Sequence, residues 1–160
     1  MRRFILGGIV LAVTHGGALA IGFALGVYLL PILTAPKSPD AAALREQAQA
    51  AVFTGNFQRD LRGSDFLHWG EGRVSIAPTR IVHEGKLAPG PDYKVYLLDR
   101  FVEHEEEFLP IKHTARLVGD VKSFDGFVLD VPPGIDPAAY TTILIWCEAF
   151  SEFISAARYR

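Results

Sequence analysis

Residues 141–147 read Thr-Thr-Ile-Leu-Ile-Trp-Cys, and this stretch decides the fold class. After the two threonines it is apolar at every position, so it lacks the polar alternation of a strand with one face in water. A short apolar run rich in β-branched and aromatic residues is typical of a strand that is buried on both faces. We therefore predict that 141–147 is a central strand of a covered sheet.

The residues that precede this strand form short apolar runs separated by Gly, Pro and Asp, at intervals of roughly ten residues. This spacing is typical of an antiparallel sandwich or barrel, and Gly90-Pro91-Asp92 and Pro132-Pro133-Gly134 supply turns. The tail 150–157 has apolar residues at helical spacing and is expected to be a helix packed on the sandwich. The predicted fold is an all-β antiparallel sandwich with strands at 52–58, 65–69, 72–77, 80–84, 93–98, 115–118, 126–131 and 141–147.

The beginning of the chain has a different character. No charged residue occurs from Phe4 to Leu33, and about 20 apolar residues already cross a hydrocarbon core. Because the run exceeds the core of a signal peptide, about 7–15 residues, we predict one transmembrane helix within 1–34, acting as an uncleaved anchor. Cleavage near 34–36 is the alternative. Arg2 and Arg3 precede the run, so the N-terminus is expected to be cytoplasmic and the remainder periplasmic or extracellular.

Two features of this helix each have two interpretations. Gly22 and Gly26 match the small-xxx-small pattern through which membrane helices form homodimers, but glycine is also common in membrane helices generally. His15 lies in the middle of the apolar run, where it either serves as a haem ligand or partner-helix contact or bonds a backbone carbonyl of its own helix. The run contains no second His or Met, so haem binding is the less favoured hypothesis.

Residues 35–51 differ abruptly in composition from the anchor. Pro36 and Pro39 end the membrane helix, and Ser38 or Asp40 is suited to cap a short helix that continues to Ala51. We therefore predict a linker over 35–51 that tethers a domain over 52–160.

The overall composition excludes several classes of protein. With 16 Lys and Arg against 18 Asp and Glu, the chain lacks the basic excess of a nucleic-acid-binding domain. A single cysteine excludes an internal disulfide and a Cys-rich zinc site. No Gly-x-Ser-x-Gly, phosphate-binding loop, His-Glu-x-x-His or Cys-x-x-Cys motif occurs, so nothing supports a hydrolase, a nucleotide enzyme or a c-type cytochrome.

Two histidine-containing segments are candidates that we do not favour. The run 103–107, Glu-His-Glu-Glu-Glu, with His113 nearby offers ligands to a cation, but consecutive residues on a strand or loop seldom converge on one ion. We expect a solvated acidic edge there and no metal site. His83, next to Glu84, is expected to be exposed and is given no role.

Cys147 has the most distinctive chemistry of any residue in the chain. A thiol at the end of a buried strand is suited to a mixed or intermolecular disulfide, a sulfenic acid or a soft metal, or it is only a small buried hydrophobe. No basic neighbour in sequence lowers its pKa, and Glu148 acts in the opposite direction. His68, before Trp69-Gly70, is either a ligand or proton carrier or a packed histidine bonded to backbone.

Several blocks of the sequence resemble the DM-thirteen domain: 53–57, His68 with 72–76, Gly-Pro-Asp-Tyr-Lys-Val-Tyr-Leu at 90–97, and 140–147 ending in Ile-Trp-Cys. The resemblance covers about residues 52–160, although 119–125 departs from the family pattern. That family is called an electron-transfer domain because it occurs beside DOMON-type haem domains and cytochrome b modules. The resemblance implies that Cys147 is its signature cysteine, proposed to be redox-active, and that Asp92 is the acid of the Gly-Pro-Asp block.

We therefore predict a single-pass membrane protein that acts as a redox or electron-transfer accessory through Cys147, with Asp92, Trp146 and His68 shaping its surroundings. Because no DOMON or cytochrome module is attached, the electron partner is expected to be a separate protein. No cofactor is evident from the sequence. The alternative is a non-catalytic envelope module that binds a protein or a small apolar ligand in the sandwich, with Cys147 only packing.

Overall fold

The computed structural model describes residues 2–160, and the chain divides into two compact units, one ending at Thr34 and the other running from Ala35 to Arg160. The first unit is α1 (Arg2–Thr34), which is long and apolar enough to cross a membrane. His15 Nδ1 donates to the carbonyl of Leu11, one turn back, at 2.9 Å. The structure therefore agrees with the interpretation in which His15 bonds a backbone carbonyl of its own helix.

The second unit begins with α2 (Ala41–Ala48), which lies in the segment expected to be a linker. The helix starts where predicted, because the Asp40 carboxylate accepts a hydrogen bond from the Ala43 backbone N–H at 2.8 Å. Leu44 is buried, and α2 packs against the first sheet. The segment therefore contributes a helix that covers one face of the sandwich.

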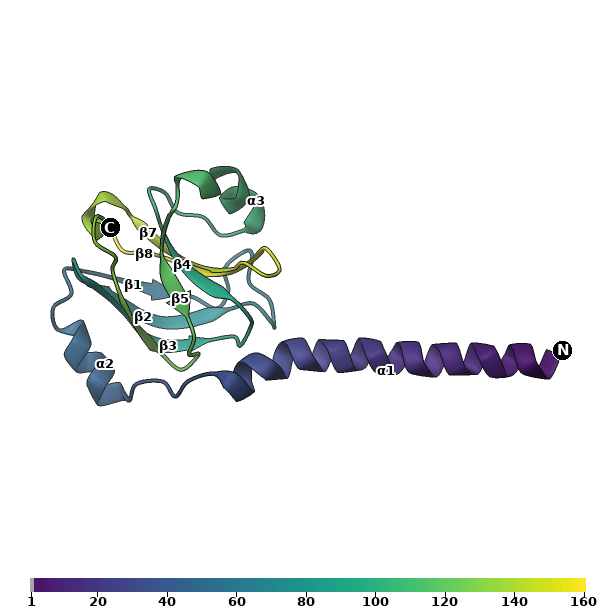
Figure 1. Cartoon of the computed structure of the whole chain (residues 1–160). Helices are drawn as coiled ribbons and strands as arrows, with labels where there is room; N and C mark the ends of the chain where they lie inside the picture. The colour runs from purple at the N-terminus through teal and green to yellow at the C-terminus, as the bar shows by residue number, and fades with distance from the viewer. Residues whose placement is uncertain (1) are drawn as a thin grey trace. The chain divides into compact units, whose positions relative to one another are not determined.

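Two four-stranded antiparallel sheets form the body of this unit, which confirms the predicted fold class (Figure 1). The first sheet contains, in spatial order, β1 (Phe53–Phe57), β2 (Gly70–Ile76), β3 (Arg80–Leu87) and β6 (Phe127–Asp130). The second contains, in spatial order, β5 (Arg116–Val121), β4 (Tyr93–Leu98), β7 (Thr142–Cys147) and β8 (Glu152–Arg158).

As predicted, β7 is a central strand with every residue buried. Ile145 and Cys147 face the core between the sheets, whereas Leu144 and Trp146 belong to a second cluster on the other face. That second face is covered by α3 (Glu105–Phe108) and the short helix η1 (Leu109–Thr114), and the rings of Phe108 and Trp146 lie 4.8 Å apart. Both faces of β7 are therefore withdrawn from water.

Two predicted elements were wrong, and each has a local cause. Residues 65–69 form a loop, since the Asp65 carboxylate accepts hydrogen bonds from the backbone N–H groups of Leu67 and His68 at 2.7 Å. The tail is β8, not a helix. The pairing of β7 with β8 shifts register between Ile145 and Trp146. Phe153 belongs to the outer cluster and Ile154 to the inner core. Because both faces of the strand are buried, the spacing of its apolar residues resembles that of a helix.

The acidic run forms the start of α3. His104 Nδ1 accepts a hydrogen bond from the Glu106 N–H at 3.3 Å, and Glu107 accepts one from the Glu103 N–H at 2.8 Å. Glu105 accepts a hydrogen bond from the Phe153 N–H at 3.1 Å. Acidic residues in the first turn also stabilise the helix through a favourable interaction with its dipole. Among residues 2–160, no group of three or more His, Cys, Asp or Glu side chains could hold a metal ion.

His83 was expected to be exposed, and that prediction was wrong, because it is fully buried between the sheets. It shares a face with Val74, and its ring lies 5.2 Å from Phe57 and 5.1 Å from Phe127. Its Nε2 donates to the Glu71 carbonyl at 3.0 Å. Only a glycine fits at position 85, since a Cβ there would lie 2.0 Å from the Glu71 carbonyl oxygen and 2.7 Å from Nε2 of His83. Burial lowers the pKa of His83 to about 4, and the hydrogen bond to Glu71 only partly opposes this.

This burial predicts an acid-sensitive fold. Between pH 6.5 and about 4 the unfolded chain binds a proton at His83 that the native chain does not. The free energy of unfolding should therefore fall with decreasing pH by about 3 kcal/mol more than in His83→Leu, which has no such group. Urea unfolding of the full chain at several pH values measures this difference. The control, His113→Gln at an exposed site, should keep the wild-type slope, and equal slopes in wild type and His83→Leu would contradict the assignment.

Candidate functional site

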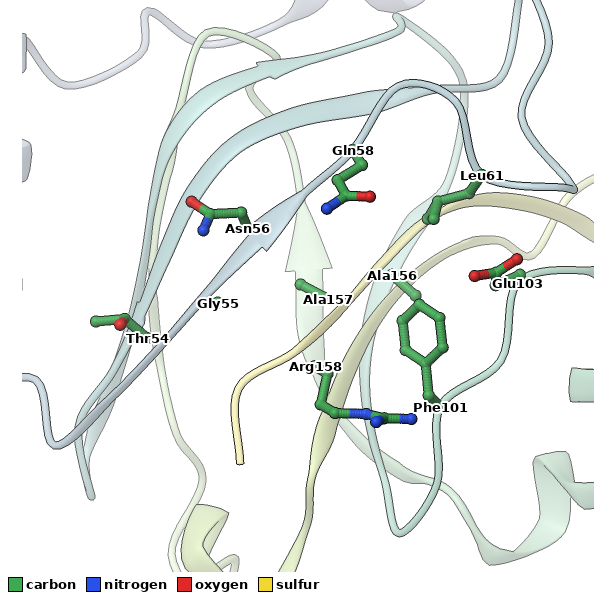
Figure 2. Close-up of a pocket in the computed structure, with 10 residues that line it drawn as sticks. All are labelled: Thr54, Gly55, Asn56, Gln58, Leu61, Phe101, Glu103, Ala156, Ala157 and Arg158. Atoms are coloured by element: carbon green, nitrogen blue, oxygen red, sulfur yellow. The ribbon is translucent and has the colours of Figure 1, made fainter.

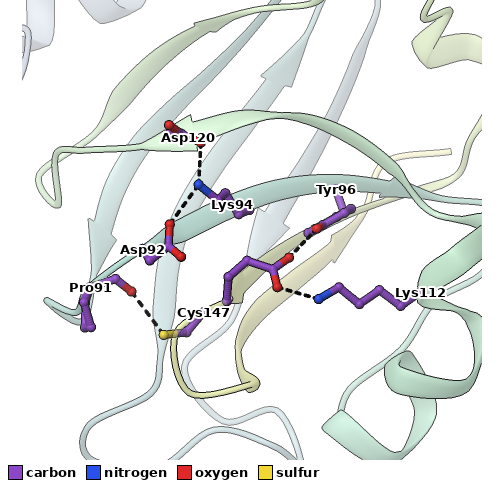
Figure 3. A network of polar contacts seen from close by, with 8 residues as sticks. Pro91, Asp92, Lys94, Tyr96, Lys112, Asp120 and Cys147 are labelled. Carbon is purple, nitrogen blue, oxygen red and sulfur yellow. Dashed lines mark hydrogen bonds and ion pairs between the residues drawn. The ribbon is translucent and has the colours of Figure 1, made fainter.

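The turn before β4 holds the end of β7. Cys147 lies opposite Tyr93 in the pairing of the two strands, and its Sγ–H donates to the Pro91 carbonyl at 3.1 Å. The backbone N–H of Glu148 donates to the carbonyl of Asp92 at 3.1 Å. Two consecutive carbonyls of the Gly-Pro-Asp turn therefore bind two consecutive residues at the end of β7. Figure 3 shows the first of these bonds, from Cys147 to Pro91.

The thiol of Cys147 is buried and protonated. The residue is 2% exposed and belongs to the inter-sheet core. Burial raises the pKa of this thiol, the carboxylates of Asp92 and Glu152 raise it further, and the backbone N–H groups of Phe150 and Ala149 partly offset the rise. A low-pKa reactive thiolate needs the opposite environment. Cys147 is therefore held as a neutral thiol at neutral pH.

Asp92 combines an unusual backbone with a charge network. Its φ of 54° lies in the left-handed region, which Asp tolerates better than most residues. Its carboxylate accepts from Lys94 Nζ at 2.8 Å, and the same Nζ lies 2.8 Å from Asp120. These bonds raise the pKa of Lys94, and the Lys94 hydrogen bond lowers the pKa of Asp120. Asp92 is thus linked to the end of β7 through its backbone carbonyl and to Lys94 through its carboxylate.

Tyr93 is a neighbour of Cys147 that the sequence analysis did not single out. Its ring is 2% exposed and packs edge-on against Phe124 with ring centroids 6.0 Å apart. Burial raises the pKa of Tyr93, and the negative charge that Cys147 carries once it is deprotonated at high pH raises it further. Its place in the Gly-Pro-Asp-Tyr block was the available signal, because the turn fixes which residue of β4 faces Cys147.

The side chain of Trp146 points to the opposite face of the sheet from that of Cys147, because consecutive strand residues alternate between the two faces. Its indole is fully buried in the outer cluster beside Phe108, and Lys112 Nζ lies 5.5 Å from its ring centroid. The structure therefore brings Trp146 next to Cys147 along the chain but does not bring its ring to the thiol.

Glu148 also turns away from Cys147. Its carboxylate accepts hydrogen bonds from the Tyr96 hydroxyl and from Lys112. Burial alone would raise the pKa of Glu148, but the bonds from Lys112 and Tyr96 outweigh it and lower the pKa. The acids that act on the thiol are thus Asp92 and Glu152, whereas Glu148 was the neighbour expected from the sequence.

His68 lies in the loop between β1 and β2, and its imidazole is bound to Asp65, with Nδ1 3.1 Å from Oδ2. Burial would raise the pKa of Asp65, but hydrogen bonds from Leu67 and His68 lower it. Burial likewise raises the pKa of Glu152, and His68 counteracts this effect. His68 therefore acts on the same end of the sandwich as Cys147 through Glu152, the strand partner of Cys147, without bonding the thiol.

A groove of about 450 Å³ lies between β1 and β8, but neither histidine nor cysteine lines it (Figure 2). On α1, Gly22 and Gly26 are exposed, and a Cβ added at either would meet nothing within 4 Å. Both glycines are therefore free of contacts within the chain.

Comparison with known proteins identifies one relationship. Residues 57–159 match the model of a protein family described as Electron transfer DM13, the DM-thirteen family of the sequence analysis. The matched segment is more than half of the chain and contains β2 to β8, the Gly-Pro-Asp turn and Cys147. No curated protein and no solved structure shows significant similarity to the chain.

The geometry predicts slow reaction of the native thiol. With a buried sulfur and a raised pKa, Cys147 should react with iodoacetamide only when the Gly-Pro-Asp turn opens, so alkylation should be about 100-fold slower than in urea. Mass spectrometry of timed samples measures both rates. Asp92→Asn should react faster than wild type because it removes a carboxylate that raises the thiol pKa. Asp99→Asn should not, because Asp99 is exposed and follows the opposite end of β4 from Cys147. Equal native and unfolded rates would contradict the assignment.

Proposed function

The chain belongs to the DM13 electron-transfer family, and from this premise we propose that it is a membrane-anchored electron-transfer accessory whose redox group is Cys147. The supporting observation is that the family match spans the whole arrangement around this cysteine: β7, the Gly-Pro-Asp turn and the opposing Tyr93. Two hydrogen bonds to backbone carbonyls, from the Cys147 thiol to Pro91 and from the Glu148 N–H to Asp92, hold this arrangement in the reduced form.

The chemistry available to one thiol per chain is a disulfide with a second molecule. The Cys147 thiol and a partner thiol each lose a proton and an electron, the S–S bond forms, and a haem-bearing partner accepts the two electrons one at a time. In the reduced form, the Pro91 carbonyl accepts a hydrogen bond from the thiol. Because Sγ is buried, the reaction requires the turn at 90–92 to move away from the end of β7.

The second candidate is a binding module in which Cys147 only packs. A specific observation favours it: the thiol is 2% exposed, neutral and hydrogen-bonded to a backbone carbonyl. These are properties of a structural cysteine. The two candidates differ in what the sulfur does, so substitution of Cys147 separates them.

The discriminating experiment follows haem reduction in native membranes. If Cys147 carries electrons, Cys147→Ser and Cys147→Ala should each slow reduction of the membrane haems by about tenfold or more, because neither side chain can form the disulfide. The matched control is Ile145→Val, which loosens the same face of the same strand by about 1 kcal/mol and keeps the thiol. Absorbance of the haem bands gives the rate.

Two results are informative in this experiment. A loss in both Cys147 variants but not in Ile145→Val supports the redox function. Wild-type rates in both Cys147 variants would overturn it and favour the binding module.

We further propose that α1 anchors the protein with its N-terminus in the cytoplasm and the sandwich on the periplasmic or extracellular side. Arg2 and Arg3 precede the apolar run and support this orientation by the positive-inside rule. Residues 35–40 between the two helices span at most about 22 Å. This short connection would keep the domain near the membrane, where membrane-bound electron partners occur.

We propose that two copies of α1 associate through Gly22 and Gly26, whose lack of side chains permits close approach of two helices. Gly22→Ile and Gly26→Ile should each reduce self-association several-fold in a two-hybrid assay for membrane helices. Ala24→Ile, which lies outside this row, is the matched control and should leave association unchanged. Unchanged association in both glycine variants would contradict the dimer.

A further inference from the structure

A groove of about 450 Å³ separates two strands that pair with nothing on that side. It lies between β1, the edge strand of the first sheet, and β8, the edge strand of the second. The strands approach closely at Gly55, where a Cβ would lie 2.6 Å from the Arg158 carbonyl. Alanines on β8 and Gly55 on β1 supply a shallow floor. Small side chains thus leave room for a ligand between the sheets' edges.

Two opposite charges face this groove without a counter-charge. The Arg158 guanidinium stacks on Phe101, with Cζ 5.4 Å from the ring centroid, and makes no ion pair with residues 2–160. Glu103 uses its backbone N–H and carbonyl to bind Glu107 and Gly63, but its carboxylate has no partner among the same residues. In Figure 2 the Phe101 ring lies between the two charged groups. The guanidinium is therefore oriented by stacking while all its N–H donors stay free.

Neutral polar groups line the opposite wall. Asn56 and Gln58 are exposed and two residues apart, so their side chains lie on one face of the chain at about 7 Å spacing. Each amide both donates and accepts hydrogen bonds. This wall suits the alternating N–H and C=O groups of a peptide backbone.

We propose that the groove is a binding site for short zwitterionic peptides, with the ligand's carboxylate on Arg158 and its ammonium group on Glu103. An Arg guanidinium binds a carboxylate with paired, charge-assisted hydrogen bonds, and a carboxylate accepts from an ammonium. The amides of Asn56 and Gln58 bind the ligand's peptide group. This site is independent of the function proposed for Cys147.

A neutral sugar fits the groove less well for two reasons. It would leave both charges without a partner, and the face of Phe101 on which a sugar ring would stack already carries Arg158. A purely anionic ligand would meet the Glu103 carboxylate, and a purely cationic one would meet Arg158. Only a ligand with both charges complements both residues.

The test is calorimetric titration of the full chain in detergent micelles with four probes: Ala-Ala, N-acetyl-Ala-Ala, Ala-Ala-amide and the neutral disaccharide cellobiose. Blocking either end of the dipeptide should weaken binding to the wild type about fivefold, because one exposed charge contact is lost. The variants Arg158→Gln and Glu103→Gln should each weaken Ala-Ala binding by a similar factor. Arg116→Gln and Glu46→Gln, exposed and outside the groove, are the matched controls.

The pairing of variants with probes distinguishes contact from structure. In Glu103→Gln, N-acetylation of the dipeptide should not weaken binding further, whereas amidation should still weaken it about fivefold. In Arg158→Gln, amidation should not weaken binding further, whereas N-acetylation should still weaken it about fivefold. A variant that merely damaged the fold would weaken all dipeptides equally. Four results would each overturn the proposal. They are equal weakening of all dipeptides in a variant, no binding of Ala-Ala, binding of the blocked dipeptides as tight as that of Ala-Ala, and tighter binding of cellobiose than of Ala-Ala.

Discussion

The burial of β7 on both faces is the constraint on which the rest of the domain depends. A strand that reads Ile-Leu-Ile-Trp-Cys has no side that water can occupy, so one face needs the first sheet and the other needs α3 and η1. The same strict alternation assigns each side chain its direction: Cys147 inward, Trp146 outward to Phe108. The thiol and the indole are therefore neighbours in sequence that occupy separate clusters.

The Gly-Pro-Asp turn converts this buried strand into a defined site. The carbonyls of Pro91 and Asp92 bind the Cys147 thiol and the Glu148 N–H, respectively, so the turn and the strand end are held together. Burial, and to a smaller extent the carboxylates of Asp92 and Glu152, raise the pKa of the thiol and keep it protonated, and Lys94 forms an ion pair with Asp92. The thiol is thus covered where the turn meets the end of β7, and a reagent reaches it only if this contact opens.

Polar groups are placed at two very different depths in this sandwich. His83 lies among aromatic rings and stays neutral, so it acts on stability and is removed from any exchange with solvent. Arg158 and Glu103 remain accessible at the edge, where charge is retained and a ligand can reach it. The separation leaves the redox candidate and the groove as distinct sites built from the two ends of β8 and its partners.

Sequence alone determined the sandwich class, the apolar helix and the candidate Cys147, because composition, local periodicity and the Gly-Pro-Asp and Ile-Trp-Cys blocks are properties of adjacent residues. It could not determine that 150–157 pairs with β7, since a bulge produces the same apolar spacing as a helix. It also could not determine the burial of His83 or the pairing of Tyr93 with Cys147. Those depend on which strands meet across the sheets, and only the tertiary structure decided them.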